Sequence, residues 1–134
     1  MAFQRAVYAA GVIEREDGHV LIATGKEQSD STRLWQFPRC PVTSGETPEA
    51  AMRRFTTEEF DMPVEIIEGR PPLVCQVDGR EIELRYFFCG PVGDDPCKGS
   101  FAEIRWVPKA HLSEYDFDPA SKPVADWLLG NDPH

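Results

Sequence analysis

The stretch from residue 37 to residue 62 reads FPRCPVTSGETPEAAMRRFTTEEFDM, and it carries most of the information about this chain. In its centre Thr47, followed by a proline, has the residue types that favour a helix N-cap and a first helical position. One acid, Glu46, precedes the predicted helix, and two more, Glu58 and Glu59, lie close to its end. Carboxylates gathered by a turn and a helix can hold a hard divalent cation, which prefers oxygen ligands.

Arg54 lies one helical turn before Glu58, at the i, i+4 spacing that brings two side chains together on a helix surface. The same charged residues also have a simpler interpretation that involves no metal ion. In it, Arg54, Glu58 and Glu59 form only a solvated helix face linked by ion pairs, because runs of charge usually are solvated.

The same residues resemble the signature of the Nudix hydrolase family. That signature runs Gly, five residues, Glu, seven residues, Arg-Glu, an aliphatic residue, any residue, Glu-Glu, any residue, Gly and an aliphatic residue. Its first Glu, its Arg and its Glu-Glu pair are matched at the family's spacing by Glu46, Arg54, Glu58 and Glu59. Four other positions differ from the signature, and they hold Cys40, Phe55, Thr56 and Asp61.

The resemblance implies hydrolysis with Mg²⁺ or Mn²⁺, in which water attacks a phosphoryl group. It makes Glu58, Glu59 and Arg54 the catalytic residues, with the arginine orienting the carboxylates. It also implies a metal site made of Glu59, Glu58 and Glu46. Either carboxylate of the Glu-Glu pair holds the metal or accepts the proton of the water.

Phe55 stands where the family has a further carboxylate, one turn before Glu59 and on the same helix face. A phenyl ring cannot bind a metal ion, so we predict a reduced site with weaker metal affinity. Such a site is physically possible, because Mg²⁺ usually keeps several waters and uses substrate phosphate oxygens. We expect the ring to stay on the metal face, because the spacing from Glu46 to Glu59 contains no insertion that would rotate the helix.

Segments on both sides of this stretch resemble the MutT-like members of the family. The sequence WQFP at 35–38 is similar to the segment that leads into their signature, and residues 117–124 are similar to their end. The resemblance puts Ser121 at the place of an Asn that helps to read an oxidised guanine. For substrate binding we expect Arg39 to contact a phosphate and Phe37 to be among the few aromatic side chains that stack on a base.

The rest of the chain predicts strands joined by short turns. Apolar runs rich in β-branched and aromatic residues favour strands at 6–13, 19–24, 73–77, 82–89 and 103–107. Asp-Gly pairs predict two hairpins, which join 6–13 to 19–24 and 73–77 to 82–89. A short helical turn is predicted near 109–112, and a last helix is predicted from 118 to 129.

Length and charge narrow the function classes. The chain has 134 residues, which predicts one domain over 1–134, and its net charge of −9 argues against duplex nucleic acid or an anionic membrane as a partner. It shows no membrane-spanning run and no signal-peptide pattern. Its four cysteines have no metal-binding spacing, so we interpret them as reduced thiols of a cytoplasmic protein; Cys40, beside the loop, has no visible His partner.

We therefore expect an α/β (α+β) fold of the Nudix type, in which a mixed β-sheet is sandwiched between helices. The expected function is hydrolysis of a nucleoside diphosphate linked to another group, with a nucleoside triphosphate as the favoured small-molecule substrate. The alternative is a Nudix-fold nucleotide-binding or regulatory domain with impaired catalysis, which the residues at 40, 55 and 61 favour.

Overall fold

The computed structural model describes residues 6–25, 34–77, 79–93, 95–97, 99 and 101–131. The strands are β1 (Ala6–Ile13), β2 (His19–Gly25), β3 (Arg39–Pro41), β4 (Val64–Gly69), β5 (Leu73–Val77), β6 (Arg80–Pro91) and β7 (Phe101–Pro108). The helices are α1 (Pro48–Phe60), the 3-10 segment η1 (Lys109–Glu114), α2 (Lys122–Asp126) and the π-helical turn η2 (Trp127–Asn131). This combination confirms the predicted α+β class.

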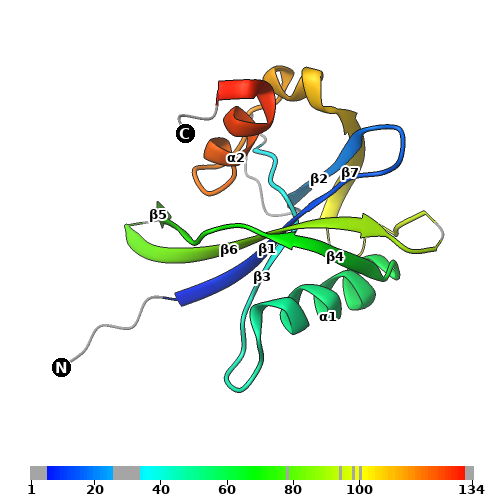
Figure 1. The fold of residues 1–134 in the computed structure, drawn as a ribbon. Helices are drawn as coiled ribbons and strands as arrows, with labels where there is room; N and C mark the ends of the chain where they lie inside the picture. The colour runs from blue at the N-terminus through cyan, green and yellow to red at the C-terminus, as the bar shows by residue number, and fades with distance from the viewer. Residues whose placement is uncertain are drawn as a thin grey trace.

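The larger sheet is mixed, because its long strand β6 runs parallel to β1 and antiparallel to β4 and β5. Along one edge of β6, β5 pairs with residues 80–84 and β4 pairs with residues 87–91. Strand β3 adds antiparallel to the other edge of β1. Strands β2 and β7 form a separate antiparallel pair beside this sheet (Figure 1).

The predicted hairpin between residues 6–13 and 19–24 forms only at its turn, where the Arg15 N–H donates to the His19 carbonyl. Next to the turn, β1 and β2 are connected by the isolated bridge of Glu14 with Val20, and they then enter different sheets. Strand β1 pairs instead with β3 through residues 8–10 and with β6 along its other edge. The hairpin between 73–77 and 82–89 is confirmed, with Val77 paired to Arg80 and Leu73 to Leu84.

Helices cover both faces of the sheet, as predicted. Helix α1 lies below the larger sheet and α2 lies above it in Figure 1. The lower core joins α1 to the sheet through Ala51, Met52, Phe60, Met62 and Cys89. The upper core joins the sheet to η1 and α2 through Phe37, Leu84, Leu112, Phe117 and Val124.

Local chemistry explains where α1 begins and ends. The hydroxyl of Thr47 accepts a hydrogen bond from the Ala50 N–H over 3.1 Å, and Pro48 takes the first helical position, as predicted. The helix ends at Asp61, which has the left-handed conformation with φ of 51°. The family signature has a Gly at that place, and a Gly or short polar residue is what a left-handed helix end favours.

The last predicted helix begins later than expected. Residues 118–121 form a turn in which Asp118 Oδ1 accepts the Ser121 N–H over 3.0 Å, and α2 begins only at Lys122. The hydrogen-bonding side chain of Asp118 competes with helix formation there. The strands β3 and β4 were not predicted. Among the described residues, no helix is long and apolar enough to cross a membrane.

Candidate functional site

Arg54 joins the loop before α1 to the helix itself. Its Nε donates to Glu46 Oε2 over 2.8 Å and its Nη2 donates to Glu46 Oε1 over 3.1 Å, so both oxygens of that carboxylate are bound. Its Nη1 lies 3.4 Å from Glu58 Oε1, one turn further along α1. Glu46 Oε1 also accepts hydrogen bonds from the N–H and the hydroxyl of Thr43. The structure therefore brings Glu46, Arg54 and Glu58 together, with the arginine in the middle.

These contacts change the acid–base behaviour of the pair. Hydrogen bonds, first from Arg54 and then from Thr43, lower the pKa of Glu46 from an ordinary 4.5 to about 2. The bond to Glu46 in turn raises the pKa of the Arg54 guanidinium. Both groups are thus charged at neutral pH, and a two-bond arginine–carboxylate pair holds its partners in a defined orientation.

We expect this pair to make stability depend on pH in the acid range. Because the pKa of Glu46 is lower in the folded state, its contribution is complete above about pH 4.5 and is lost as the pH falls towards about 2. The variant Glu46→Gln should be less stable than wild type at neutral pH, and the difference should shrink across this window. Urea unfolding at several pH values measures it.

Glu49→Gln is the matched control for that series, since Glu49 is an exposed acid in the first turn of the same helix. A difference between wild type and Glu46→Gln that stays constant from pH 5 to pH 2 would contradict the assignment of the lowered pKa to Glu46.

Phe55 shares a helix face with Glu59, and this face is packed against the start of β7. Its half-buried ring meets the Phe60 ring edge-on at 5.7 Å and the Phe101 ring edge-on at 6.3 Å between centroids. Phe60 and Phe101 stack on each other at 5.7 Å with an interplanar angle of 18°. The ring is thus partly buried against the lower core, and its place on a metal face stays a prediction.

The chain before β7 reaches the same end of α1. The Cys97 N–H donates to the Phe60 carbonyl over 2.8 Å. Gly99 has φ of +57°, and a Cβ at this position would collide with the Glu59 carbonyl oxygen and lie 2.8 Å from Glu59 Oε1. Only glycine fits this close approach. Glu59 is thus half-buried between its own helix and this segment.

The described residues do not fit a resident metal site. Within 6–25, 34–77, 79–93, 95–97, 99 and 101–131, no group of three or more His, Cys, Asp or Glu side chains is placed to hold a metal ion. Glu46 is bound through both oxygens to Arg54, and the same guanidinium pairs with Glu58. The predicted ligands Glu46, Glu58 and Glu59 are not brought together as one cluster, and metal binding there stays a prediction.

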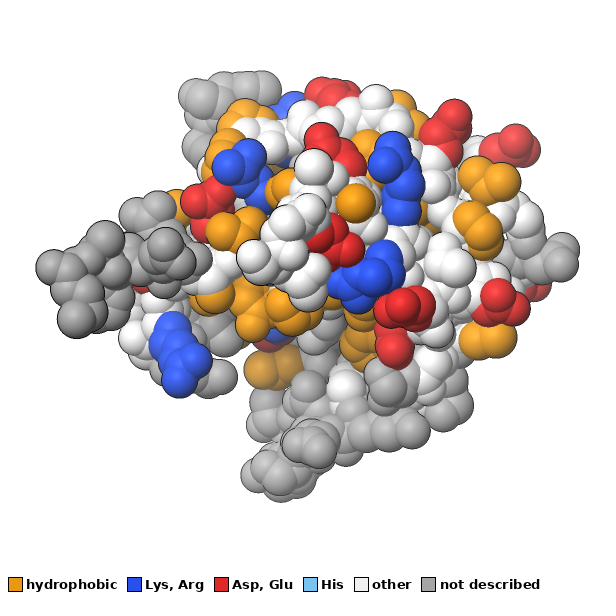
Figure 2. Space-filling model, turned by 90° about the horizontal axis from the view of Figure 1, so that it is seen from below, with side chains coloured by type: hydrophobic (Ala, Val, Ile, Leu, Met, Phe, Trp, Pro, Cys, Tyr) orange, Lys and Arg blue, Asp and Glu red, His pale blue; other side chains and the backbone are white. Residues whose placement is uncertain are grey.

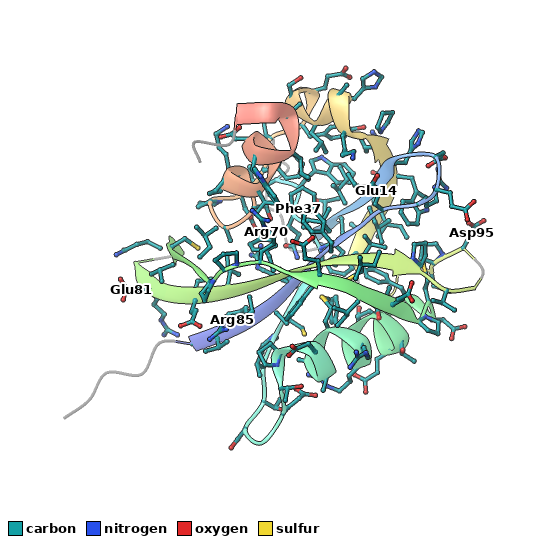
Figure 3. The ribbon with its side chains drawn as sticks, in the orientation of Figure 1. Glu14, Phe37, Arg70, Glu81, Arg85 and Asp95 are labelled. Carbon is teal, nitrogen blue, oxygen red and sulfur yellow. The ribbon has the colours of Figure 1, made fainter. Side chains whose placement is uncertain are left out.

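Two of the predicted substrate-binding residues belong to the interior. Phe37 is 0% exposed, lies between the sheet and the upper helices (Figure 3), and stacks on Phe117 at 5.2 Å. Ser121 is 1% exposed, and its hydroxyl accepts the Phe37 N–H over 3.1 Å. Both residues are close together, as a shared subsite requires, but each already has a structural partner.

Arg39 is the third predicted substrate-binding residue. It lies in β3 and forms an ion pair with Asp118. The Arg39 Nη1 to Asp118 Oδ2 distance is 2.8 Å, and about five sixths of each side chain is buried, with exposed fractions of 17% and 16%. Within the described residues, no hydrogen bond from Nη1 accompanies this ion pair. Near this pair, burial raises the pKa of the Tyr86 hydroxyl, which donates to the Ala120 carbonyl over 2.8 Å.

The other departures from the family signature are accommodated by local contacts. Cys40 is buried, and its thiol donates to the Ala51 carbonyl over 3.5 Å. Burial raises the pKa of that thiol to about 11, which disfavours the thiolate form that a nucleophile requires. Thr56, in the aliphatic position, is buried with its hydroxyl bonded to the Arg53 carbonyl over 3.2 Å.

Charges of both signs share the face on the α1 side. Figure 2, which views the molecule from below, shows acidic and basic side chains next to one another among apolar ones. This mixture is consistent with the Arg54 ion pairs described above. It matches a small charged ligand better than a long polyanion, which needs a continuous basic surface.

Sequence reasoning missed two residues near the site. Asp118 was interpreted only as the start of a helix, although an acid next to a proline-containing turn is also a candidate partner for a distant arginine. The second is Gly99, which lies between the predicted strands at 82–89 and 103–107. Its close contact with Glu59 has no local signal, because the two residues are brought together by the path of the chain.

Comparisons with known proteins agree on one family. A family model described as NUDIX domain matches residues 3–128. The chain is 27% identical over 126 residues to an 8-oxo-dGTP diphosphatase of Haemophilus influenzae, covering 94% of this chain and 92% of that protein. It is 25% identical over 116 residues to the Escherichia coli protein of the same name, covering 87% and 90%. The solved Escherichia coli ORF135 protein superimposes with a TM-score of 0.82 at 24% identity, covering 95% and 90%, which confirms the predicted fold.

Proposed function

The chain belongs to the NUDIX domain family, and from this premise we propose that it hydrolyses a nucleoside diphosphate linked to another group, most directly a nucleoside triphosphate. The observation that carries the proposal is the loop–helix unit in which Arg54 holds Glu46 and Glu58. The names of the two relatives supply the substrate class, and the acidic chain suits a small phosphorylated ligand rather than a nucleic acid.

Three side chains of the loop–helix unit have separate roles in the proposed reaction. Arg54 fixes the loop through Glu46 and keeps Glu58 at the end of α1 next to Glu59. Glu59 or Glu58 accepts the proton of the water that attacks phosphorus, because both are carboxylates at the same helix end. A nucleotide would bring Mg²⁺ or Mn²⁺ bound to its phosphates, and the chemistry that such an ion would supply is neutralisation of the phosphate charge, while Glu59 or Glu58 keeps the role of proton acceptor.

Base selection is expected to be weak. Ser121 offers one hydroxyl, which already accepts the Phe37 N–H, and it cannot replace the two-sided hydrogen bonding of an amide. Arg39 is the residue that can contact a phosphate, provided that the ligand competes with Asp118 for its guanidinium. The four free thiols, of which Cys97 is exposed, fit a reducing compartment such as the cytoplasm.

A phosphate-release screen over nucleoside triphosphates and nucleoside diphosphate conjugates tests the proposal. We expect hydrolysis that needs high Mg²⁺ or prefers Mn²⁺, with 8-oxo-dGTP and dGTP differing by less than about a hundredfold, or about 2.7 kcal/mol. Hydrolysis that saturates at micromolar Mg²⁺ would contradict the reduced site. A larger preference for 8-oxo-dGTP would mean that another residue reads the base.

A second candidate function is nucleotide binding without hydrolysis. The observation that favours it is Phe55, whose ring occupies the position of a carboxylate and packs on Phe60 and Phe101. Titration calorimetry with the same nucleotides separates the two functions. Binding together with no phosphate release under any metal condition would support the second candidate and remove the first.

A further inference from the structure

Three aromatic rings connect α1 to β7 at the place where the family signature has an acid. Phe60 is fully buried, whereas Phe55 and Phe101 are half-buried. Phe55 meets the other two edge-on, at 5.7 and 6.3 Å, and those two stack at 5.7 Å. Edge-on and stacked rings at these distances attract each other beyond simple burial. The helix and the strand are thus held together by apolar contacts.

The segment that leads into β7 lies against the same helix face. Gly99 is so close to Glu59 that no side chain fits between them, and the Cys97 N–H is bonded to the Phe60 carbonyl. A second carboxylate at position 55 would lie one turn from Glu59, and two like charges there would repel unless a cation lay between them. Phe55 removes both the repulsion and the need for the cation.

The other carboxylates of the site already have a positive partner. Both oxygens of Glu46 are bound to Arg54, at 2.8 and 3.1 Å, and Glu58 lies 3.4 Å from the same guanidinium. A divalent ion would have to compete with this fixed charge. Among the described residues no three His, Cys, Asp or Glu side chains are grouped to hold such an ion, which usually takes six or more ligands, including water.

We propose that the packing of Phe55 on Phe60 and Phe101 links α1 to β7 without a metal ion, so that the protein alone holds no divalent cation. The ion enters the site only in complex with a nucleotide, whose phosphates supply the missing ligands. The absence of a resident ion is independent of the proposed function. The entry of the ion together with a nucleotide rests on the proposed function.

Titration of the protein with Mn²⁺, followed by the electron paramagnetic resonance signal of the free ion, tests this proposal. For the wild-type protein alone we expect binding no tighter than about millimolar. With a non-hydrolysable nucleoside triphosphate analogue, we expect Mn²⁺ to be retained beyond what the analogue retains by itself. Retention of Mn²⁺ by the wild-type protein alone at micromolar concentrations would overturn the proposal.

Thermal unfolding gives a second readout that does not depend on activity. The wild-type Tm should be the same in EDTA and in Mn²⁺. In Phe55→Glu the aromatic connection is lost, so the Tm in EDTA should fall and Mn²⁺ should raise it again, with Mn²⁺ affinity at least about tenfold above wild type. The control Phe55→Leu keeps an apolar side chain and should show neither metal effect.

The Mn²⁺ titration and the thermal unfolding distinguish a failure of this proposal from a failure of the proposed function. A wild-type Tm that rises with Mn²⁺ would overturn the proposal even if Phe55→Glu does not fold. If the nucleotide screen finds no hydrolysis, the titration of the protein alone still decides whether a resident ion is present. Mn²⁺ retained only with the analogue supports the proposal, and no added retention with the analogue overturns its second half.

Discussion

Replacing Phe37 with alanine is expected to lower the free energy of unfolding by about 3–5 kcal/mol, the usual loss for a buried aromatic side chain. The ring is 0% exposed and stacks on Phe117 at 5.2 Å with an interplanar angle of 12°. Its removal leaves a cavity between the sheet and the upper helices. Small proteins have only about 5–15 kcal/mol of stability in total, so this loss is a large fraction of it.

Urea unfolding at neutral pH measures this effect, with two variants for comparison. Phe37→Leu keeps most of the apolar volume and should lose clearly less. Ile67→Ala removes a side chain that is 66% exposed and should change stability by less than about 0.5 kcal/mol. If Phe37→Ala were nearly as stable as wild type but bound nucleotide poorly, the substrate-binding role predicted from the sequence would be the correct one.

The second large effect is expected at Glu59. Glu59→Gln keeps the size of the side chain and removes its negative charge, so it can neither accept the proton of water nor attract a metal–nucleotide complex. We expect kcat/KM for the best substrate of the screen to fall by at least about a hundredfold, as for other lost acid–base groups. The Tm should change little, because Glu59 is half-buried and the amide fits the same space next to Gly99.

Two other acids of the same helix provide the controls for this substitution. Glu58→Gln should have a smaller effect on the rate, since its side chain is 64% exposed and its contact with Arg54 is long. Glu49→Gln, at the other end of the helix, should leave the rate unchanged. If Glu59→Gln instead lowered the Tm strongly and left the rate intact, Glu59 would be part of a salt-bridged helix face, as in the simpler interpretation of the charge run.

Residues close in sequence made much of this protein predictable. The cap at Thr47, the proline after it and the left-handed Asp61 determine the bounds of α1, and each acts within one helical turn. The hairpin of β5 and β6 follows from an Asp-Gly turn and alternating apolar residues on its second arm. The position of Arg54 relative to Glu58 follows from helix geometry alone. Backbone preferences and short-range hydrogen bonds carry all of these signals.

Contacts between distant residues were decided only by the tertiary structure. An equally good Asp-Gly signal gave only a turn between β1 and β2, since β1 pairs with β3 and β6 whereas β2 pairs with β7. The hydroxyl of Ser121 is committed to the Phe37 N–H, 84 residues away, and no local pattern contains that pairing. The surroundings of Phe55 likewise depend on β7 being brought to the end of α1. Strands compete for a limited number of sheet edges, and helices compete for a limited number of sheet faces. This competition determines which side chains meet across the core. No short stretch of sequence contains that information.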